Sequence, residues 1–115
     1  MSLPVDLAVL DRMDDVLGSA SETNDLVAEF LRSADGWSAA IAAQATGGAG
    51  TDGHRGAHTL ASSAAMVGAF ELARRARALE EVFAKGEAPD EASRLEIGAL
   101  LVQVRAAWMA AGRAT

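Results

Sequence analysis

The sequence predicts an all-α fold, namely an antiparallel up-down four-helix bundle with an additional short N-terminal helix. First, alanine, the best helix former, supplies 27 of the 115 residues, while β-branched residues are sparse. Second, five segments carry apolar residues at helical spacing. Third, each of the four longer segments has one apolar stripe, which it can bury only against its neighbours. A chain of this length suits one domain, which we expect to span residues 1–115.

The first two helices are bounded by recognisable start and stop signals. The first is expected to run from about Pro4, a residue suited to a first turn, to Leu17, with Gly18 ending it. Because it is the shortest, we expect it to cover one end of the bundle. The second begins near Ser19, which has capping-box spacing to Glu22. Its expected buried face comprises Leu26, Phe30, Ala34, Trp37 and Ile41.

Two loops separate the remaining helices. Four of the seven residues from 47 to 53 are glycine, and each would cost roughly 1 kcal/mol relative to alanine inside a helix. Residues 85–90 join a glycine stop to a proline restart. We therefore expect a third helix from residue 51 or 52 to about 66, a fourth after a break at Gly68, and a fifth over about 89–111. The apolar stripes of the last two comprise Leu72, Ala76, Leu79, Phe83, Ile97, Leu101, Val104 and Trp108.

The large and flexible apolar side chains are expected to pack inside this bundle. Trp37 and Trp108 are predicted to be core anchors. Met13, Met66 and Met109 are predicted to pack in the core or at its ends.

Composition and charge exclude several classes of function. The net charge of −6 argues against nucleic acid as a partner, because its phosphates favour Lys and Arg. The absence of cysteine excludes disulfides, thiolate zinc sites and thiol nucleophiles. No apolar run reaches the ~18 residues of a membrane span, and no segment reads as a signal peptide. We therefore expect a soluble, cytoplasmic protein with no membrane partner.

One histidine, His58, is predicted to stand on the exposed face of the third helix. If Leu60 lies at the centre of the buried stripe, Ala57 and Ala64 fall within about 60° of it, at about 100° per residue. His58 then points about 160° away from that centre. It shares the outer face with His54, Arg55, Ser62 and Ala65, while Ala61 lies toward the edge.

An exposed imidazole among small neighbours suits a phosphoryl acceptor. Ser62, Ala61 and Ala65 would leave the ring above a flat surface that a partner protein can approach closely. A neutral imidazole is a good nucleophile near pH 7, because the ordinary pKa of histidine lies close to that value. No pocket is required on this chain, since the partner can bring the metal and the acidic cradle.

The residues of this face allow three other interpretations. An exposed histidine on a helix is often simply solvated. His54 and His58 have the i, i+4 spacing of paired zinc ligands, but no third ligand is evident, and we expect no metal site. An autonomous enzyme is not expected, because the chain has neither a glycine loop followed by Lys-Ser or Lys-Thr nor an evident Ser-His-Asp set.

The segment around His58 resembles the histidine-containing phosphotransfer (HPt) domains of multistep two-component relays. Residues 57–60, Ala-His-Thr-Leu, match the start of the family pattern, and Gly68 falls at the expected tenth position after His58. Leu72 and the Leu79-Glu80 pair match the next helix. The resemblance extends more loosely over nearly the whole chain.

The resemblance implies a four-helix bundle that shuttles a phosphoryl group between receiver-domain aspartates on His58, without kinase or phosphatase activity of its own. The implied partners are the receiver domains of a hybrid histidine kinase and of a response regulator, with Mg²⁺ on the receiver and no cofactor on this chain. Glu80 lies where family members often place a polar group near the imidazole, so it would orient the ring. A carrier that presents His58 to two partners has no need of a dimer, so we expect a monomer.

The chain departs from the family pattern just after the histidine. The family lysine three residues on is Ala61 here, and the following glycine is Ser62. Arg55 or His54 could supply the missing charge from the preceding turn, and the Ser62 hydroxyl could donate a hydrogen bond to phosphate. The nucleophile itself remains.

Receiver docking is expected on a small apolar patch around Ala61, Ala65 and Gly68, rimmed by polar groups. Arg74, in a basic cluster with Arg75 and Arg77, could help an acidic receiver to dock, although such clusters are usually solvated. The alternative function is a non-catalytic helical adaptor, which fits everything except the face around His58.

Overall fold

The computed structural model describes residues 3–115, which form five helices and, within that range, no strand. The predicted all-α class is confirmed. The helices are α1 (Leu7–Leu17), α2 (Ala20–Ala43), α3 (Asp52–Met66), α4 (Phe70–Ala84) and α5 (Glu91–Ala110). None of the helices in residues 3–115 is both long and apolar enough to cross a membrane.

Capping side chains set where the helices begin. The Ser19 hydroxyl accepts a hydrogen bond from the Glu22 backbone N–H at 3.1 Å, as the capping-box spacing predicted. The predicted start of the first helix at Pro4 is wrong. Helix α1 begins at Leu7, because the carboxylate of Asp6 accepts from a first-turn N–H and so fixes the N-cap there.

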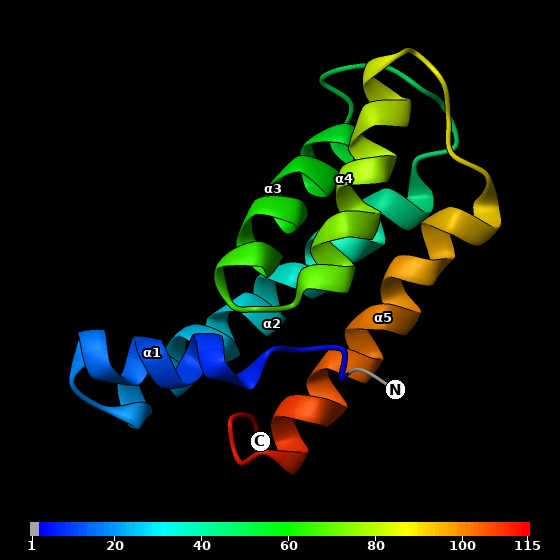
Figure 1. Cartoon of the computed structure of the whole chain (residues 1–115). Helices are drawn as coiled ribbons and strands as arrows, with labels where there is room; N and C mark the ends of the chain where they lie inside the picture. The colour runs from blue at the N-terminus through cyan, green and yellow to red at the C-terminus, as the bar shows by residue number, and fades with distance from the viewer. Residues whose placement is uncertain (1–2) are drawn as a thin grey trace.

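Each helix packs against one or more of the others (Figure 1). Helix α3 packs against α2 and α4, α5 packs against the same two helices, and α1 packs against α2. Helices α3 and α4 run antiparallel and are joined by the short turn at residues 67–69. Helix α1 lies toward one end of the molecule, and the loops at 44–51 and 85–90 lie together at the other.

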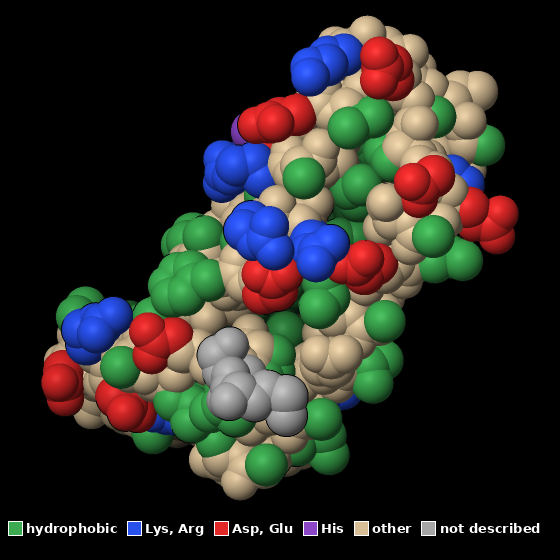
Figure 2. All heavy atoms as spheres, turned by 45° about the vertical axis from the view of Figure 1, so that its right-hand side comes forward, with side chains coloured by type: hydrophobic (Ala, Val, Ile, Leu, Met, Phe, Trp, Pro, Cys, Tyr) green, Lys and Arg blue, Asp and Glu red, His purple; other side chains and the backbone are tan. Residues whose placement is uncertain are grey.

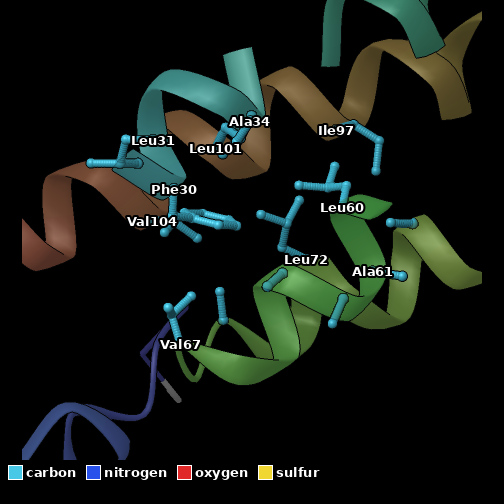
Figure 3. Packing of buried hydrophobic residues seen from close by; sticks show 14 of the residues in the cluster. Phe30, Leu31, Ala34, Leu60, Ala61, Val67, Leu72, Ile97, Leu101 and Val104 are labelled. Carbon is cyan, nitrogen blue, oxygen red and sulfur yellow. The ribbon is translucent and has the colours of Figure 1, made fainter. Parts of the chain in front are cut away.

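The core between these helices is apolar and closely packed (Figure 3). Leu60, Leu72 and Ile97 are completely buried and come from three different helices. The ring of Phe30 meets that of Trp108 edge to face, with 5.7 Å between centroids. Burying one such side chain stabilises a fold by about 1.5–3 kcal/mol. The apolar core therefore holds α3 in its position in the fold.

Some residues predicted to be buried are exposed. Leu26 has 42% of its surface exposed, whereas Val27 is fully buried, because the stripe of α2 is rotated by one residue toward Thr23, Val27 and Phe30. Met66 and Met109 are 74% and 50% exposed, so the prediction that they pack in the core or at its ends is wrong. Both lie on the solvent side of their helices. Trp108 is fully buried, which confirms its prediction as a core anchor, and Met13 packs partly buried against the core, as predicted. Trp37 is only partly buried and lines a surface groove, so it packs against the core without being buried in it.

Gly68 is a buried structural residue, and its predicted place in a docking patch is wrong. Its φ is +85°, which glycine adopts without strain. Its carbonyl accepts a hydrogen bond from the Asp6 backbone N–H at 2.9 Å. A Cβ on this residue would lie 2.8 Å from the Asp6 carbonyl oxygen. Gly68 therefore lets the turn between α3 and α4 pack against the segment that precedes α1.

Candidate functional site

The rotation of α3 places His58 on its outer face. Ala57, Leu60 and Ala64 are fully buried beneath it, as the helical repeat predicted. The His58 side chain is 64% exposed. Because buried residues on either side anchor the backbone of this turn, the position of the His58 backbone on the helix surface is well defined.

The His58 ring is held from one side by Glu80 of α4. Nδ1 of His58 lies 2.5 Å from Oε2 of Glu80. A carboxylate is only an acceptor, so the hydrogen-bond geometry assigns the ring proton to Nδ1. In the neutral ring Nε2 therefore carries the free electron pair. The Glu80 side chain is only 20% exposed, so the carboxylate is itself partly ordered by its surroundings.

Ser62 lies one turn after His58 and is tied to the backbone. Its hydroxyl donates to the His58 carbonyl oxygen at 3.3 Å, a long hydrogen bond that a better acceptor could displace. The side chain is exposed, as predicted, so the approach to the imidazole along α3 is open.

His54 and Arg55 point toward the loop before α3. The Arg55 guanidinium donates to the Gly50 carbonyl at 2.5 Å and to the Asp52 carboxylate at 2.6 Å. Nδ1 of His54 accepts from the Gly50 backbone N–H at 3.1 Å. Within residues 3–115 neither side chain forms a hydrogen bond or ion pair with His58, so the structure does not bring the predicted charge substitutes to the ring.

Ala61 is buried, and the prediction that it contributes to a docking patch is wrong. Only 1% of its surface is exposed. Its position about 60° from His58 turns it toward α4, which packs against α3. Ala65 is partly exposed and is the one small residue of the predicted patch that reaches the surface.

Two exposed apolar residues that sequence analysis missed lie at the same end of the α3–α4 pair. Met66 is 74% exposed and Phe70 is 51% exposed. Met66 follows His58 by eight residues, about 80° around the helix, so a helical wheel could have found it. Met66 also borders an apolar groove, whose walls include Met13, Leu26 and Trp37.

The arginines of α4 differ in how their charge is balanced. Arg74 donates to Glu71 at 2.7 and 3.0 Å, while Arg75 pairs with Glu71 and Glu96. The guanidinium of Arg74, followed by that of Arg75, lowers the pKa of Glu71 to about 2. Figure 2 shows that acidic and basic side chains alternate over one face of the molecule, with a histidine at its edge.

Arg77, the third arginine of this cluster, is exposed. It takes part in no ion pair or side-chain hydrogen bond with any residue between 3 and 115.

The described part of the chain, residues 3–115, contains no group of three or more His, Cys, Asp or Glu side chains placed to hold a metal ion. At His58 the site presents one exposed imidazole, which the carboxylate of Glu80 orients.

The family model described as Hpt domain matches residues 25–108, well over half of the chain. The match includes all of α3 and α4, and with them His58 and Glu80. The comparisons with curated proteins and with solved structures found no match.

Proposed function

The chain belongs to the Hpt domain family, and from this premise we propose that it carries a phosphoryl group between receiver-domain aspartates on Nε2 of His58. Hpt domains are phosphocarriers of two-component phosphorelays and interact with receiver domains. The observation that carries the assignment to His58 is its pairing with Glu80, which leaves Nε2 as the unprotonated, outward nitrogen of a 64% exposed ring.

The proposed reaction is a direct displacement at phosphorus. The electron pair of Nε2 attacks the phosphorus of a receiver aspartyl phosphate, so that a P–N bond forms and the P–O bond to the aspartyl carboxyl breaks. The departing electron pair leaves on the aspartate as a carboxylate. The proton on Nδ1 stays in place, so the ring becomes a phosphorylated imidazolium, whose positive charge the Glu80 carboxylate stabilises. Transfer to a second receiver reverses these steps.

This chemistry needs little machinery on the present chain. The receiver supplies the aspartyl phosphate and the Mg²⁺ that neutralises the charge on the phosphoryl oxygens. The donor is proposed to be the receiver of a hybrid histidine kinase and the acceptor that of a response regulator. We further propose that the chain acts as a single-domain, up-down four-helix bundle, monomeric and cytoplasmic.

Receiver docking is proposed on the surface formed by Ala65, Met66 and Phe70, beyond the C-terminal side of His58. This surface replaces the patch predicted around Ala61 and Gly68, which are buried. Exposed apolar side chains this large provide an anchor for a small, transient interface. Met66 lies about 12 Å along the helix axis from His58, within the footprint of one docked domain.

The test is phosphotransfer from radiolabelled receivers. The wild-type chain is incubated with each phosphorylated receiver of the source organism, and the bound label is tested for acid lability and base stability. We expect label on the wild type and on His54→Gln, a matched control at the only other histidine, and none on His58→Gln. If the wild type takes no label from any receiver, the adaptor function replaces this proposal.

A further inference from the structure

A phosphoryl group on His58 would need a cation that the contacts described so far do not provide. A phosphorylated side chain carries a charge of about −1.5 to −2 at pH 7. At the Nδ1 side of the ring, the imidazolium proton and the Glu80 carboxylate offset each other. The phosphoryl group on the opposite nitrogen would therefore have no counterion of its own, in a chain whose net charge is already −6.

Most of the nearby cations are already engaged. Arg55 is bound to Asp52 and to the Gly50 carbonyl, and both Arg74 and Arg75 are bound to Glu71. To reach a phosphoryl group, each would first have to give up an ion pair of 2.6–3.0 Å. Arg77 is exposed and makes no such pair within residues 3–115, so its guanidinium can move without that loss.

The register of α3 against α4 places Arg77 beside the site. The two helices are antiparallel, and the contact between His58 and Glu80 fixes their alignment. One turn forward on α3 therefore corresponds to one turn back on α4, so Arg77 lies opposite Ala61. Residues three apart on a helix are surface neighbours, so Arg77 also lies on the Glu80 side of α4.

The residue opposite Arg77 leaves room for its side chain. Ala61 ends at Cβ and is buried against α4, so it presents no bulk above the helix surface. Ser62, the next residue, is exposed and small. An arginine can therefore extend across this part of α3 toward the Nε2 side of His58.

We propose that Arg77 is the phosphate-binding residue of the loaded state, its guanidinium donating to the oxygens of the phosphoryl group on His58. This inference rests on the proposed phosphorylation of His58. A guanidinium suits the task because its planar fork can donate two parallel hydrogen bonds to phosphate. Arg77 does not enter the bond-making step, so it is a binding residue that stabilises the phosphorylated chain.

The test loads the whole chain chemically with potassium phosphoramidate, a small donor that phosphorylates histidine without a receiver. The ³¹P NMR signal of the phosphoryl group is then titrated with pH for the wild type, Arg77→Ala and Arg74→Ala. A nearby cation favours the dianion, so we expect a higher phosphoryl pKa in Arg77→Ala than in the wild type. Arg74→Ala, a matched loss of one charge three residues away, should leave that pKa close to the wild-type value.

A second measurement is the equilibrium between phosphorylated receiver and phosphorylated chain. Loss of a charge-assisted hydrogen bond should shift it toward the receiver by about threefold to tenfold in Arg77→Ala. Arg77→Lys should recover part of the shift. If Arg77→Ala matches the wild type in both measurements while His58 is loaded, this inference fails and the proposed function stands. If neither phosphoramidate nor any receiver loads wild-type His58, both proposals fail.

Discussion

Glu80 holds His58 by the inner ring nitrogen, with 2.5 Å between Oε2 and Nδ1, and so directs the other nitrogen outward. The two residues are 22 positions apart and come from the two antiparallel helices on either side of the turn at 67–69. One contact thereby sets the tautomer of the ring and its orientation, and it places a countercharge for the imidazolium that the proposed phosphorylation would form.

Replacing Glu80 should slow phosphotransfer without unfolding the chain. Glu80→Gln keeps a hydrogen-bond acceptor for Nδ1–H but loses the negative charge, so we expect transfer about threefold slower. Glu80→Ala loses both and should be about tenfold slower or more, because the ring also loses its orientation. Rapid-quench measurement of label transfer from a receiver gives these rates. Wild-type rates in Glu80→Ala would show that the contact has no role in the reaction.

A charge at Met66 should weaken receiver docking. Met66 is 74% exposed, so Met66→Glu should leave the stability unchanged while placing a desolvated carboxylate in the proposed interface. We expect the half-saturating receiver concentration to rise about tenfold, with little change in the transfer rate at saturation. Met109→Glu, at an exposed methionine of α5, is the control and should behave as the wild type. Equal half-saturation for the two variants would mean that the receiver docks elsewhere.

Two glycine substitutions should change stability in opposite directions. Gly68→Ala combines a positive φ with a Cβ only 2.8 Å from the Asp6 carbonyl, so we expect a loss of about 1–3 kcal/mol in the free energy of unfolding.

Gly36 lies within α2 and has open space around it, so Gly36→Ala should stabilise the chain by up to about 1 kcal/mol. Urea denaturation measures both. A neutral Gly68→Ala would contradict the tight packing of this turn.

Arg113 should make the stability depend on pH through Asp14. The Arg113 guanidinium donates to both Asp14 carboxylate oxygens, at 2.7 and 2.9 Å, and holds the pKa of that carboxyl below its ordinary value of 3.8. A lowered pKa stabilises the fold above the ordinary value, and this contribution is lost as the pH falls through the lowered one. Wild type should therefore exceed Asp14→Asn in stability at pH 7, and the difference should shrink steadily below about pH 4.

The control for this pH dependence is Asp35→Asn. Asp35 meets Arg105 at 3.2 Å and is 65% exposed, so its pair should contribute little at any pH. Urea denaturation of the three proteins at several pH values gives the comparison. A difference between wild type and Asp14→Asn that grows on acidification would contradict the assigned ion pair.

Sequence periodicity predicted the exposed orientation of His58, because the buried Ala57, Leu60 and Ala64 leave one outer face at 100° per residue. Periodicity alone does not predict whether Ala61, about 60° away from His58 around the helix, is buried or exposed. A residue at the edge of a stripe is buried or exposed according to where the next helix packs, and α4 covers Ala61. The partnership with Glu80 came from the family resemblance, since periodicity alone does not align two helices.

Local side-chain partners were also beyond sequence reasoning. Arg55 shares the outer face of α3 with His58, yet it turns back to Gly50 and Asp52, because the loop offers a carbonyl and the first turn of the helix a carboxylate within its reach. The sequence pattern predicts a surface position for Gly68, because it does not show how the segment before α1 folds. Only the path of residues 3–6 explains why no Cβ fits there.

The account is tested most directly by observing the histidine ring nitrogens of the chain after transfer from a receiver. Long-range ¹H–¹⁵N NMR distinguishes His58 from His54 and Nε2 from Nδ1. We predict that phosphorylation shifts only the Nε2 resonance of His58 into the range of a phosphorylated nitrogen, while Nδ1 of the same ring stays protonated. Phosphate on His54, on Nδ1 of His58, or on neither ring would contradict it.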